Sequence, residues 1–425
     1  MITKEAQSRP LSPSTVALVV LLPFGIGYFL SQMFRSVNAV VGPDLVRDVG
    51  LGAAELGFLT SAYLLAFALF QLPLGVLLDR FGPRRVQSVL IALAGVGSLL
   101  FALGEGFFAL SFARALIGLG FAGGLMSGFK AVVLWVPEQR RALANAVVMS
   151  FGALGIIVAT QPIDISVQAF GWRAVFAGLG VITFAVALLI LMVVPERART
   201  APATEGLHTQ IAAIGGIISS AAFWRLAPLL ASTAGAHIAI QTLWAGLWFR
   251  DVAGMGRDAV AAHLMMVAVA FMIGILLSGA VADWFIRRGV HILSVMNGFL
   301  AAFLIAEVLI VFQVESLMLP AWLLFGMTGQ VAILAYPWLS SHYGAALSGR
   351  ANTAMNLLIF ATAFGTQYAI GGIIDLFPSG TAGAYEPEAY RISFGLCLAA
   401  QVIALIWYAA GFRSLRNAPA REVEA

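Results

Sequence analysis

Three basic side chains lie inside stretches that are otherwise almost wholly apolar: Arg35, Arg114 and Lys130. A charged side chain at the centre of a bilayer costs about 2.5–3.5 kcal/mol on insertion scales, so it is expected to face a water-filled cavity or a partner. A guanidinium in such a cavity binds anions through charge-assisted hydrogen bonds. The sequence therefore predicts an anion site at Arg35, which Arg114 and Lys130 could extend. The alternative for Arg35 and Lys130 is a long side chain that snorkels to the membrane surface.

A second group of candidate residues recurs at helical spacing later in the chain. His237, Gln241 and Trp244 are separated by four and three residues, which places them on one face of a helix. A histidine there could bind substrate or carry a proton, and it could equally be a packing residue that is held by a hydrogen bond. We treat all three as candidate substrate-binding residues.

The composition indicates which elements must position these side chains. Of the 425 residues, 61% are hydrophobic and only 10% are charged, which is too little polar surface for a water-soluble protein of this length. We predict an all-α membrane protein with twelve transmembrane helices, since a bilayer needs about 20 apolar residues per helix. The expected spans are residues 15–42, 57–78, 86–104, 107–136, 142–164, 173–194, 226–249, 258–282, 290–312, 318–341, 350–376 and 389–412.

A polar stretch divides these spans into two sets of six. We predict an N-terminal six-helix bundle over residues 1–194, a cytoplasmic linker over residues 195–225 and a C-terminal six-helix bundle over residues 226–425. Most of the 24 basic residues fall in loops that would share a side with the termini. The positive-inside rule therefore places both termini in the cytoplasm and the protein in the cytoplasmic membrane.

Several function classes lack the residues that they require. No Asp or Glu occurs near the middle of spans 1, 2, 4, 5, 7, 8, 10 or 11, so a cationic substrate would lack a counter-ion. Glu307 lies near the end of span 9, where we expect an interface or packing role. We find no nucleophile triad, metal-ligand spacing or phosphate-binding loop, so we expect no enzyme, metal or cofactor. The basic residues lie at helix ends, which argues against nucleic acid as a partner.

A turn that ends one apolar span is repeated in degenerate form later in the chain. Its two aspartates, Asp79 and Asp283, are 204 residues apart, close to half of the chain, which indicates two similar halves in parallel. We predict a gating role for the residues of both copies, which are Gly75, Asp79, Arg80, Gly82, Arg84, Arg85, Gly279, Asp283, Arg287 and Arg288.

The first copy of this turn resembles the signature loop between helices 2 and 3 of the major facilitator superfamily, and the helix count and the duplication agree with that family along the chain. The resemblance implies two pseudo-symmetric six-helix bundles that rock around a cavity at the midplane. It also implies that the loop closes the cytoplasmic side through ion pairs and the positive end of helix 11, and that Asp283 with Arg287 and Arg288 repeats this latch. The cations alone would only satisfy the positive-inside rule.

The first span narrows the resemblance. Gly27 and Tyr28, followed by Arg35 and Pro43, resemble helix 1 of the organic-anion and organophosphate branch, in which the matching arginine binds the substrate anion. Antiporters for phosphorylated substrates carry a second arginine in helix 7, whereas the repeat of Arg35 in this chain falls on Ala239. A monoanion such as a carboxylate therefore fits better than a phosphate ester.

Span 4 carries a second motif of the superfamily. Arg114, Gly118 and Gly120 resemble its Arg-x-x-x-Gly-x-Gly motif, which implies a role in proton coupling or a brace between helices 1 and 4. The position of Arg114 favours the brace.

Together these features predict a secondary active transporter that moves a small organic anion, of monocarboxylate type, across the cytoplasmic membrane by alternating access. We expect proton symport or exchange for another anion, with the proton on His237 or on the substrate itself. One alternative is multidrug or metabolite efflux by proton antiport, which would favour hydrophobic cations. A second alternative is a transporter-like sensor, which would need a partner-binding extension.

Overall fold

The computed structural model describes residues 12–196, 207–377 and 383–416, and within these ranges the helices account for all regular structure. Eleven helical stretches are long and apolar enough to cross a membrane. The longest, α4 (Ala53–Leu103), has 51 residues and is interrupted at Gly82, so it supplies two crossings. The described residues thus contain twelve crossings, as predicted, and the chain is a multi-pass membrane protein.

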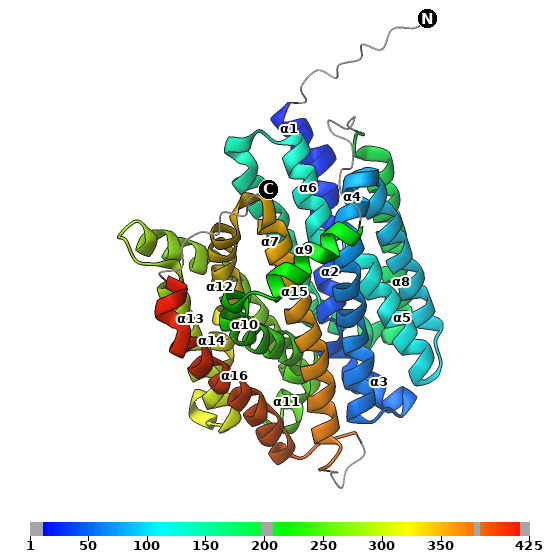
Figure 1. Ribbon diagram of the computed structural model, residues 1–425. Coiled ribbons are helices and arrows are strands. Elements are labelled where there is room, and N and C mark those ends of the chain that lie inside the picture. The colour runs from blue at the N-terminus through cyan, green and yellow to red at the C-terminus, as the bar shows by residue number, and fades with distance from the viewer. Residues whose placement is uncertain (1–11, 197–206, 378–382, 417–425) are drawn as a thin grey trace, which may run out of the picture.

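The elements follow one another along the chain without a strand in the described ranges (Figure 1). The first half consists of α1 (Pro13–Val16), η1 (Ala17–Leu21), α2 (Leu22–Ser36), α3 (Asn38–Val49), α4, α5 (Gly106–Phe121), α6 (Gly124–Trp135), η2 (Glu138–Arg140), α7 (Arg141–Val158) and α8 (Gln161–Val193). The second half consists of α9 (Leu207–Ile218), α10 (Ala221–Ala239), η3 (Ile240–Trp244), α11 (Ala245–Asp251), α12 (Arg257–Ile286), α13 (Ile292–Val311), η4 (Glu315–Leu317), α14 (Met318–Thr328), η5 (Val331–Ala335), α15 (Tyr336–Ile374) and α16 (Pro387–Arg416).

Glycines with positive φ separate spans that would otherwise form one helix. Gly82 in α4 has a φ of +78°, and Gly171 in α8 and Gly344 in α15 have values of +78° and +73°. Glycine reaches this region without the steric cost that a Cβ imposes. The backbone can therefore turn at these points from one span into the next.

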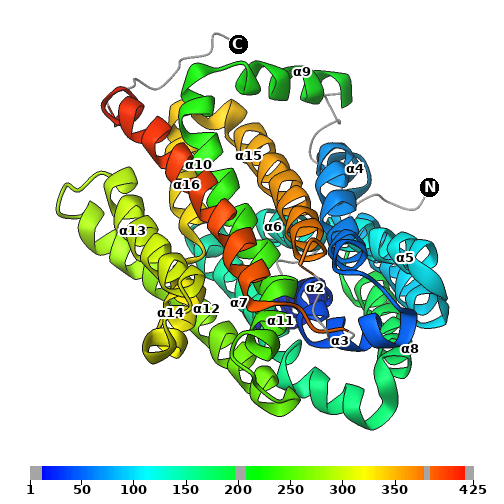
Figure 2. The ribbon, with the colours of Figure 1, turned by 90° about the horizontal axis from the view of Figure 1, so that it is seen from below.

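The two halves lie side by side, and the first half is coloured blue to green in Figure 1. The contacts between them include those of α4 with α15, of α7 and α8 with α12, and of α3 with α11. Figure 2 shows the same arrangement along the helices. The fold is that of two pseudo-symmetric six-helix bundles, with a continuous apolar core that includes residues of both.

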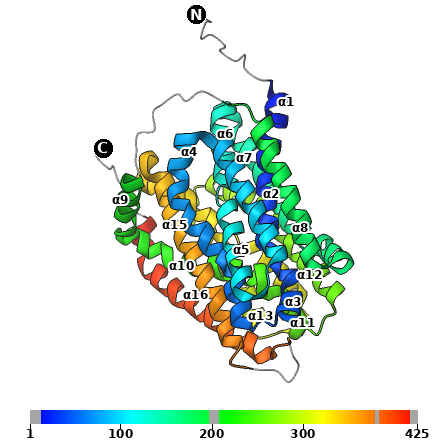
Figure 3. The ribbon, with the colours of Figure 1, turned by 90° about the vertical axis from the view of Figure 1, so that its right-hand side faces the viewer.

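The stretch expected to be a polar linker contains a helix. α9 contacts both α4 and α15 and lies along the outside of the bundle (Figures 2 and 3). Ile214 and Ile217 are buried in this contact region, because the apolar end of the stretch has a surface on which to pack. The next helix, α10, begins at Ala221 rather than at residue 226. Residues 197–206 lie outside the described residues, and the domain boundaries stay a prediction.

Candidate substrate-binding site

Arg35 lies on α2 with its guanidinium against aromatic rings from both halves. Its Cζ is 4.9 Å from the ring centre of Phe67 on α4, 5.0 Å from that of Phe360 on α15 and 6.0 Å from that of Tyr63 on α4. The rings of Phe67 and Phe360 are themselves 4.7 Å apart. Arg35 therefore lies at the point where the two halves meet.

The charge of Arg35 is stabilised by these rings but is not neutralised by a carboxylate. In the described part of the chain, Arg35 has no acidic partner within ion-pair distance, and its Nε is buried without a hydrogen-bond partner. Cation–π contacts of this kind contribute about 0.5–2 kcal/mol, and they leave the N–H donors of the guanidinium available. A carboxylate or sulfonate can accept from two of these donors at once.

Two further polar side chains share the face of α2 that carries Arg35. Tyr28 and Gln32 precede Arg35 at helical spacing, and Gln32 Nε2 donates to Tyr28 Oη at 2.6 Å. All three side chains are half-buried, whereas most of their neighbours on α2 are buried. Our sequence analysis missed Gln32, although its spacing from Arg35 was a readable signal.

The second half contributes polar groups close to Phe360. Asn356 lies one helical turn before Phe360 on α15 and accepts a hydrogen bond from the hydroxyl of Tyr336, which precedes the turn at Gly344. Asn352 lies one turn further, and its Oδ1 is buried without a hydrogen-bond partner. The sequence analysis did not select these residues, because the folding of α15 back on itself at Gly344 brings Tyr336 to Asn356.

Arg114 lies behind the helix that carries Arg35. It is fully buried, and its Nη1 donates to the carbonyl oxygen of Phe34 at 3.0 Å. Its Cζ is 5.5 Å from the ring centre of Tyr63, so Tyr63 lies between Arg114 and Arg35. The structure thus brings Arg114 to the backbone of α2 next to Arg35, which is the geometry of a brace between helices 1 and 4. Its function in transport stays a prediction.

His237 lies in an aromatic cluster inside the second half, away from Arg35. Its ring centre is 5.6 Å from Phe271 on α12, 6.0 Å from Phe303 on α13 and 5.0 Å from Phe325 on α14. The ring is 2% exposed, and its Nε2 is buried without a hydrogen-bond partner. These surroundings are those of a packing residue.

We expected His237, Gln241 and Trp244 to share one face, but His237 and Trp244 pack against different helices; a role of these residues in binding stays a prediction. The π-helical turn η3 covers residues 240–244 and widens the helix from 3.6 residues per turn, which rotates the following side chains relative to His237. Trp244 is buried against α15, where its Nε1 donates to the carbonyl oxygen of Gln367 at 3.2 Å. Gln241, which lies between them in the sequence, is half-buried, and its Nε2 is buried without a hydrogen-bond partner.

Lys130, which we had placed with the substrate-binding residues, forms an ion pair with the first copy of the repeated turn. Lys130 Nζ lies 2.8 Å from Asp79 Oδ1, so it joins α6 to the end of the first arm of α4. Arg84 donates from Nε to the carbonyl oxygen of Leu191 at 2.9 Å, and Arg85 pairs with Glu196 at 2.6 Å. Among the gating candidates of this copy, Arg80 lies over the ring of Phe81, Gly75 is part of α4, and Gly82 forms the turn.

The second copy of the turn does not repeat these contacts. Arg288 stacks on Trp284, with Cζ 3.6 Å from the ring centre, and donates to the carbonyl oxygen of the same residue. Within the described ranges, neither Asp283 nor Arg287 forms a side-chain ion pair. The ring of Trp284 contacts Arg288 in place of an acidic partner, and a gating role for Gly279, Asp283, Arg287 and Arg288 stays a prediction.

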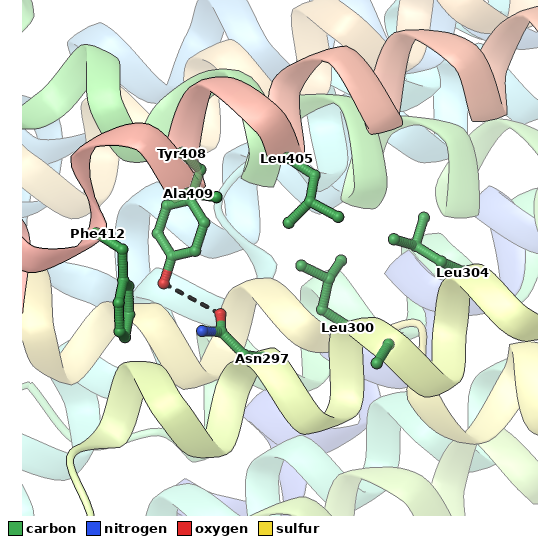
Figure 4. A pocket seen from close by; sticks show the side chains of 8 residues that line it. Asn297, Leu300, Leu304, Leu405, Tyr408, Ala409 and Phe412 are labelled. Atoms are coloured by element: carbon green, nitrogen blue, oxygen red, sulfur yellow. Dashed lines mark hydrogen bonds between the residues drawn. The ribbon is translucent and has the colours of Figure 1, made fainter.

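A cavity of about 360 Å³ lies in the second half between α13 and α16. Leu300, Leu304 and Leu405 line it, and at one end Tyr408 of α16 donates to Asn297 Oδ1 at 3.1 Å (Figure 4). Glu307, which we expected to be a packing residue, is almost fully buried and accepts from Gln401 Nε2 at 3.1 Å.

Sequence comparison relates the chain to carriers of organic acids. A probable sulfoacetate transporter, SauU, of Cupriavidus necator is 30% identical over 162 residues, which is 38% of each chain. The D-galactonate transporter of Escherichia coli O6:H1 is 28% identical over 298 residues, 65% of this chain and 69% of that protein. A probable galactarate/D-glucarate transporter, GudP, of Escherichia coli K12 is 25% identical, with 60% of this chain and 63% of the relative aligned. The chain thus spans less than two thirds of SauU and of GudP, and the names agree with the expected organic-anion branch.

Solved structures show the same fold. A bacterial homologue of the human lysosomal transporter Spinster, in an inward-facing and occupied conformation, has a TM-score of 0.78 at 19% identity and covers 96% of this chain and 100% of that chain. A D-xylose-proton symporter has a TM-score of 0.69 at 16% identity, with 92% of this chain and 97% of that chain covered. Residues 24–366 match the sequence model of the Major Facilitator Superfamily, and the chain belongs to this superfamily of transporters.

Proposed function

We propose that the protein carries a small organic anion across the cytoplasmic membrane by alternating access, with Arg35 as the anchor of the anionic group. The observation that carries this proposal is a guanidinium at the meeting point of the two halves, with no acidic partner among the described residues. A substrate bound there contacts both halves, so its binding can bias their relative position. The relatives named for sulfoacetate, galactonate and galactarate/glucarate support an organic acid as the substrate class.

The side chains around Arg35 limit the size and the charge of this substrate. A single arginine favours a substrate that presents one carboxylate or sulfonate to it. Tyr28 and Gln32 offer a hydroxyl and an amide within two helical turns of Arg35 on α2, and Asn356 offers an amide one turn from Phe360 on α15. Such groups recognise hydroxyl or carbonyl oxygens on the rest of the molecule. We therefore favour a short, polar monoanion over an apolar one.

The coupling proton, in this proposal, travels with the substrate. His237 lies among Phe271, Phe303 and Phe325, where it is almost completely shielded from solvent. His237→Phe should therefore keep uptake that is driven by a pH gradient. Loss of that uptake in a folded His237→Phe protein would indicate that His237 carries the coupling proton.

The orientation follows from the positive-inside rule. The end of the bundle that holds Asp79 carries the Arg80, Arg84 and Arg85 cluster and faces the cytoplasm with both termini. The two bundles are then residues 1–194 and 226–425, with residues 195–225 on the cytoplasmic side.

The test is ligand-dependent thermal stabilisation of the purified protein with carboxylates, sulfonates, phosphate esters, sugars and hydrophobic cations. A ligand at about 100 times its dissociation constant adds about 2.7 kcal/mol to the native state. We expect stabilisation by organic monoanions, its loss in Arg35→Gln and its retention in Arg391→Gln. Arg391 is a suitable control, because it also lies near an aromatic ring, Phe312, but is half exposed at a helix end. Stabilisation by hydrophobic cations that survives Arg35→Gln would support efflux instead.

A further inference from the structure

Glu307 and Gln401 form a buried polar pair on the seam between α13 and α16. Gln401 Nε2 donates to Glu307 Oε1 at 3.1 Å, and both side chains are almost fully buried. Each partner also has one oxygen, Glu307 Oε2 and Gln401 Oε1, that is buried without a hydrogen-bond partner. The pair therefore has two unsatisfied acceptors and no donor for them.

The charged groups that belong to this seam lie at its ends. The other ionised side chains of α13 and α16 are confined to the first and last turns of α16: Glu388, Arg391, Arg413 and Arg416. From α10, Arg225 lies over the ring of Trp407, more than one turn from Gln401. Cys397 lies one turn from Gln401 on α16, and His237 reaches the same region only through Phe303. In the described residues, no cation lies within ion-pair distance of Glu307.

A carboxylate in such a place would be a buried charge without a counter-ion, which is one of the most costly arrangements in a protein. A protonated carboxyl group avoids that cost and adds one O–H donor to a pair that lacks a donor. We propose that Glu307 is held as a neutral carboxylic acid against Gln401, and that this acid is a modification site for an apolar carbodiimide that enters from the membrane.

The cavity between α13 and α16 comes within one helical turn of this site. Leu304 precedes Glu307 by three residues on α13, and Leu405 follows Gln401 by four residues on α16. The leucines at this end of the cavity (Figure 4) therefore lie one helical turn from the acid and from its partner. Exposed apolar side chains on both helices, among them Ile305 and Ile406, show that this surface faces lipid.

The chemistry requires both the proton and the apolar surroundings. The acid transfers its proton to a carbodiimide nitrogen, and its carboxylate oxygen adds to the central carbon to give an O-acylisourea. The acyl group then moves to nitrogen and leaves a stable N-acylurea, so every atom of both reactants is kept. An ionised carboxylate at the protein surface lacks the proton for the first step, because an ordinary Glu has a pKa of about 4.3.

The experiment treats the full-length protein in proteoliposomes at about pH 7, where an ordinary Glu is ionised, with dicyclohexylcarbodiimide or with a water-soluble cationic carbodiimide. Mass spectrometry of the digested protein then locates the adducts. We expect the apolar reagent to modify Glu307 and the water-soluble reagent to leave it intact. Glu388, with a side chain that is 59% exposed, is the internal control for the water-soluble reagent when the pH is lowered.

Glu307→Gln gives a second measurement, because the amide has the shape of the neutral acid but cannot react. We expect this variant to keep uptake of the substrate and to resist inhibition by the apolar reagent, whereas uptake by the unmodified chain is inhibited. Modification of Glu307 by the water-soluble reagent as readily as Glu388, or no adduct on Glu307 with the apolar reagent, would overturn the proposal. The adduct is read without any substrate, so the result does not depend on the proposed substrate class.

Discussion

The two ends of the helical bundle hold their charged side chains in different ways. At one end, Arg257 of α12 binds Asp44 of α3 through two hydrogen bonds, of 3.0 and 2.9 Å, and binds Asp164 of α8 through a third of 2.7 Å. The two carboxylates have side chains that are only 4% and 3% exposed. Both belong to the first half of the chain, whereas Arg257 belongs to the second. We call Asp44, Asp164 and Arg257 the Arg257 cluster.

At the opposite end, the ion pairs described above join elements of the first half with each other. Lys130 binds Asp79 and Arg85 binds Glu196, with side chains that are between 39% and 60% exposed. Exposed pairs of this kind contribute about 0–1 kcal/mol, whereas removal of one partner from a buried pair costs about 3–5 kcal/mol. The comparison indicates that loss of a partner costs more in the Arg257 cluster than in either of these exposed pairs.

The largest effect is expected from Arg257→Gln. This change takes the guanidinium of the other half from two buried carboxylates and so removes the ion pairs that cross between the halves. We expect a loss of about 3 kcal/mol, at the low end of the range for a buried pair because Arg257 itself is partly exposed. We also expect the end that holds Asp44 to open more often. A Gln32→Cys reporter in a Cys397→Ser background should then react faster with a membrane-impermeant maleimide added on that side.

Arg47→Gln is the matched control for this change. Arg47 also pairs with Asp44, at 3.0 Å, but it lies on the same helix and its side chain is 70% exposed. Its removal should leave both the stability and the maleimide reaction close to those of the parent protein. Equal effects of Arg47→Gln and Arg257→Gln would contradict the idea that crossing between the halves is what matters.

Asp375→Asn should act in the same direction with a smaller effect. Asp375 at the end of α15 accepts hydrogen bonds from the backbone N–H groups of Ala53 and Ala54, at 2.8 and 2.9 Å, and so caps the start of α4 from the other half. Loss of a helix cap costs about 0.5–2 kcal/mol, and the amide keeps one acceptor but no charge. Thermal unfolding should show a loss of about 1 kcal/mol, and a loss as large as that of Arg257→Gln would contradict the expected order.

The sequence was sufficient for the spans, because a bilayer sets their length and composition. Twelve apolar runs and the repeated turn at Asp79 and Asp283 led to the correct fold. They did not predict α9 or the π-helical turn η3, since both depend on what the surrounding helices offer for packing. For the same reason, the sequence did not predict that His237 and Trp244 pack against different helices.

The part of the site that could be predicted depends on the type of a single residue in its span. Arg35 is a charge in an apolar span, and its position could be read from the sequence. The Arg257 cluster could not, because Arg257 is 213 residues from Asp44 and 93 from Asp164 and each of them reads as an ordinary loop charge. Tyr336 and Asn356 meet only because α15 turns at Gly344.

Lys130→Met tests an exposed ion pair at the end of the bundle opposite the Arg257 cluster. The pair with Asp79 is exposed on both sides, so its loss should change the unfolding free energy by less than about 1 kcal/mol. The change should shrink further in high salt, because salt screens exposed charges more than buried ones. The loss caused by Arg257→Gln should be much less sensitive to salt. A large, salt-independent effect of Lys130→Met would mean that the two ends are held with similar strength.

The smallest expected effect comes from Asp48, which lies near the Arg257 cluster but bonds only within the first half. Burial raises the pKa of its carboxyl group, but the hydrogen bond from Trp172 Nε1, of 2.9 Å, and the pairing with Arg47 outweigh this and lower the pKa below its ordinary value of 3.8. A group whose pKa is lowered in the folded state adds stability above the ordinary value and loses it as the pH falls through the lowered value. Asp48→Asn should therefore be slightly less stable than the parent at neutral pH, by less than about 1 kcal/mol for a pair this exposed, and the two should converge below the ordinary value. Thermal unfolding between neutral and acidic pH measures the convergence.

A difference in stability that persists in acid would show that the hydrogen bond from Trp172, rather than the charge of Asp48, supplies the stability. The maleimide reaction of the Gln32→Cys reporter should stay unchanged in Asp48→Asn, because no contact between the halves is lost.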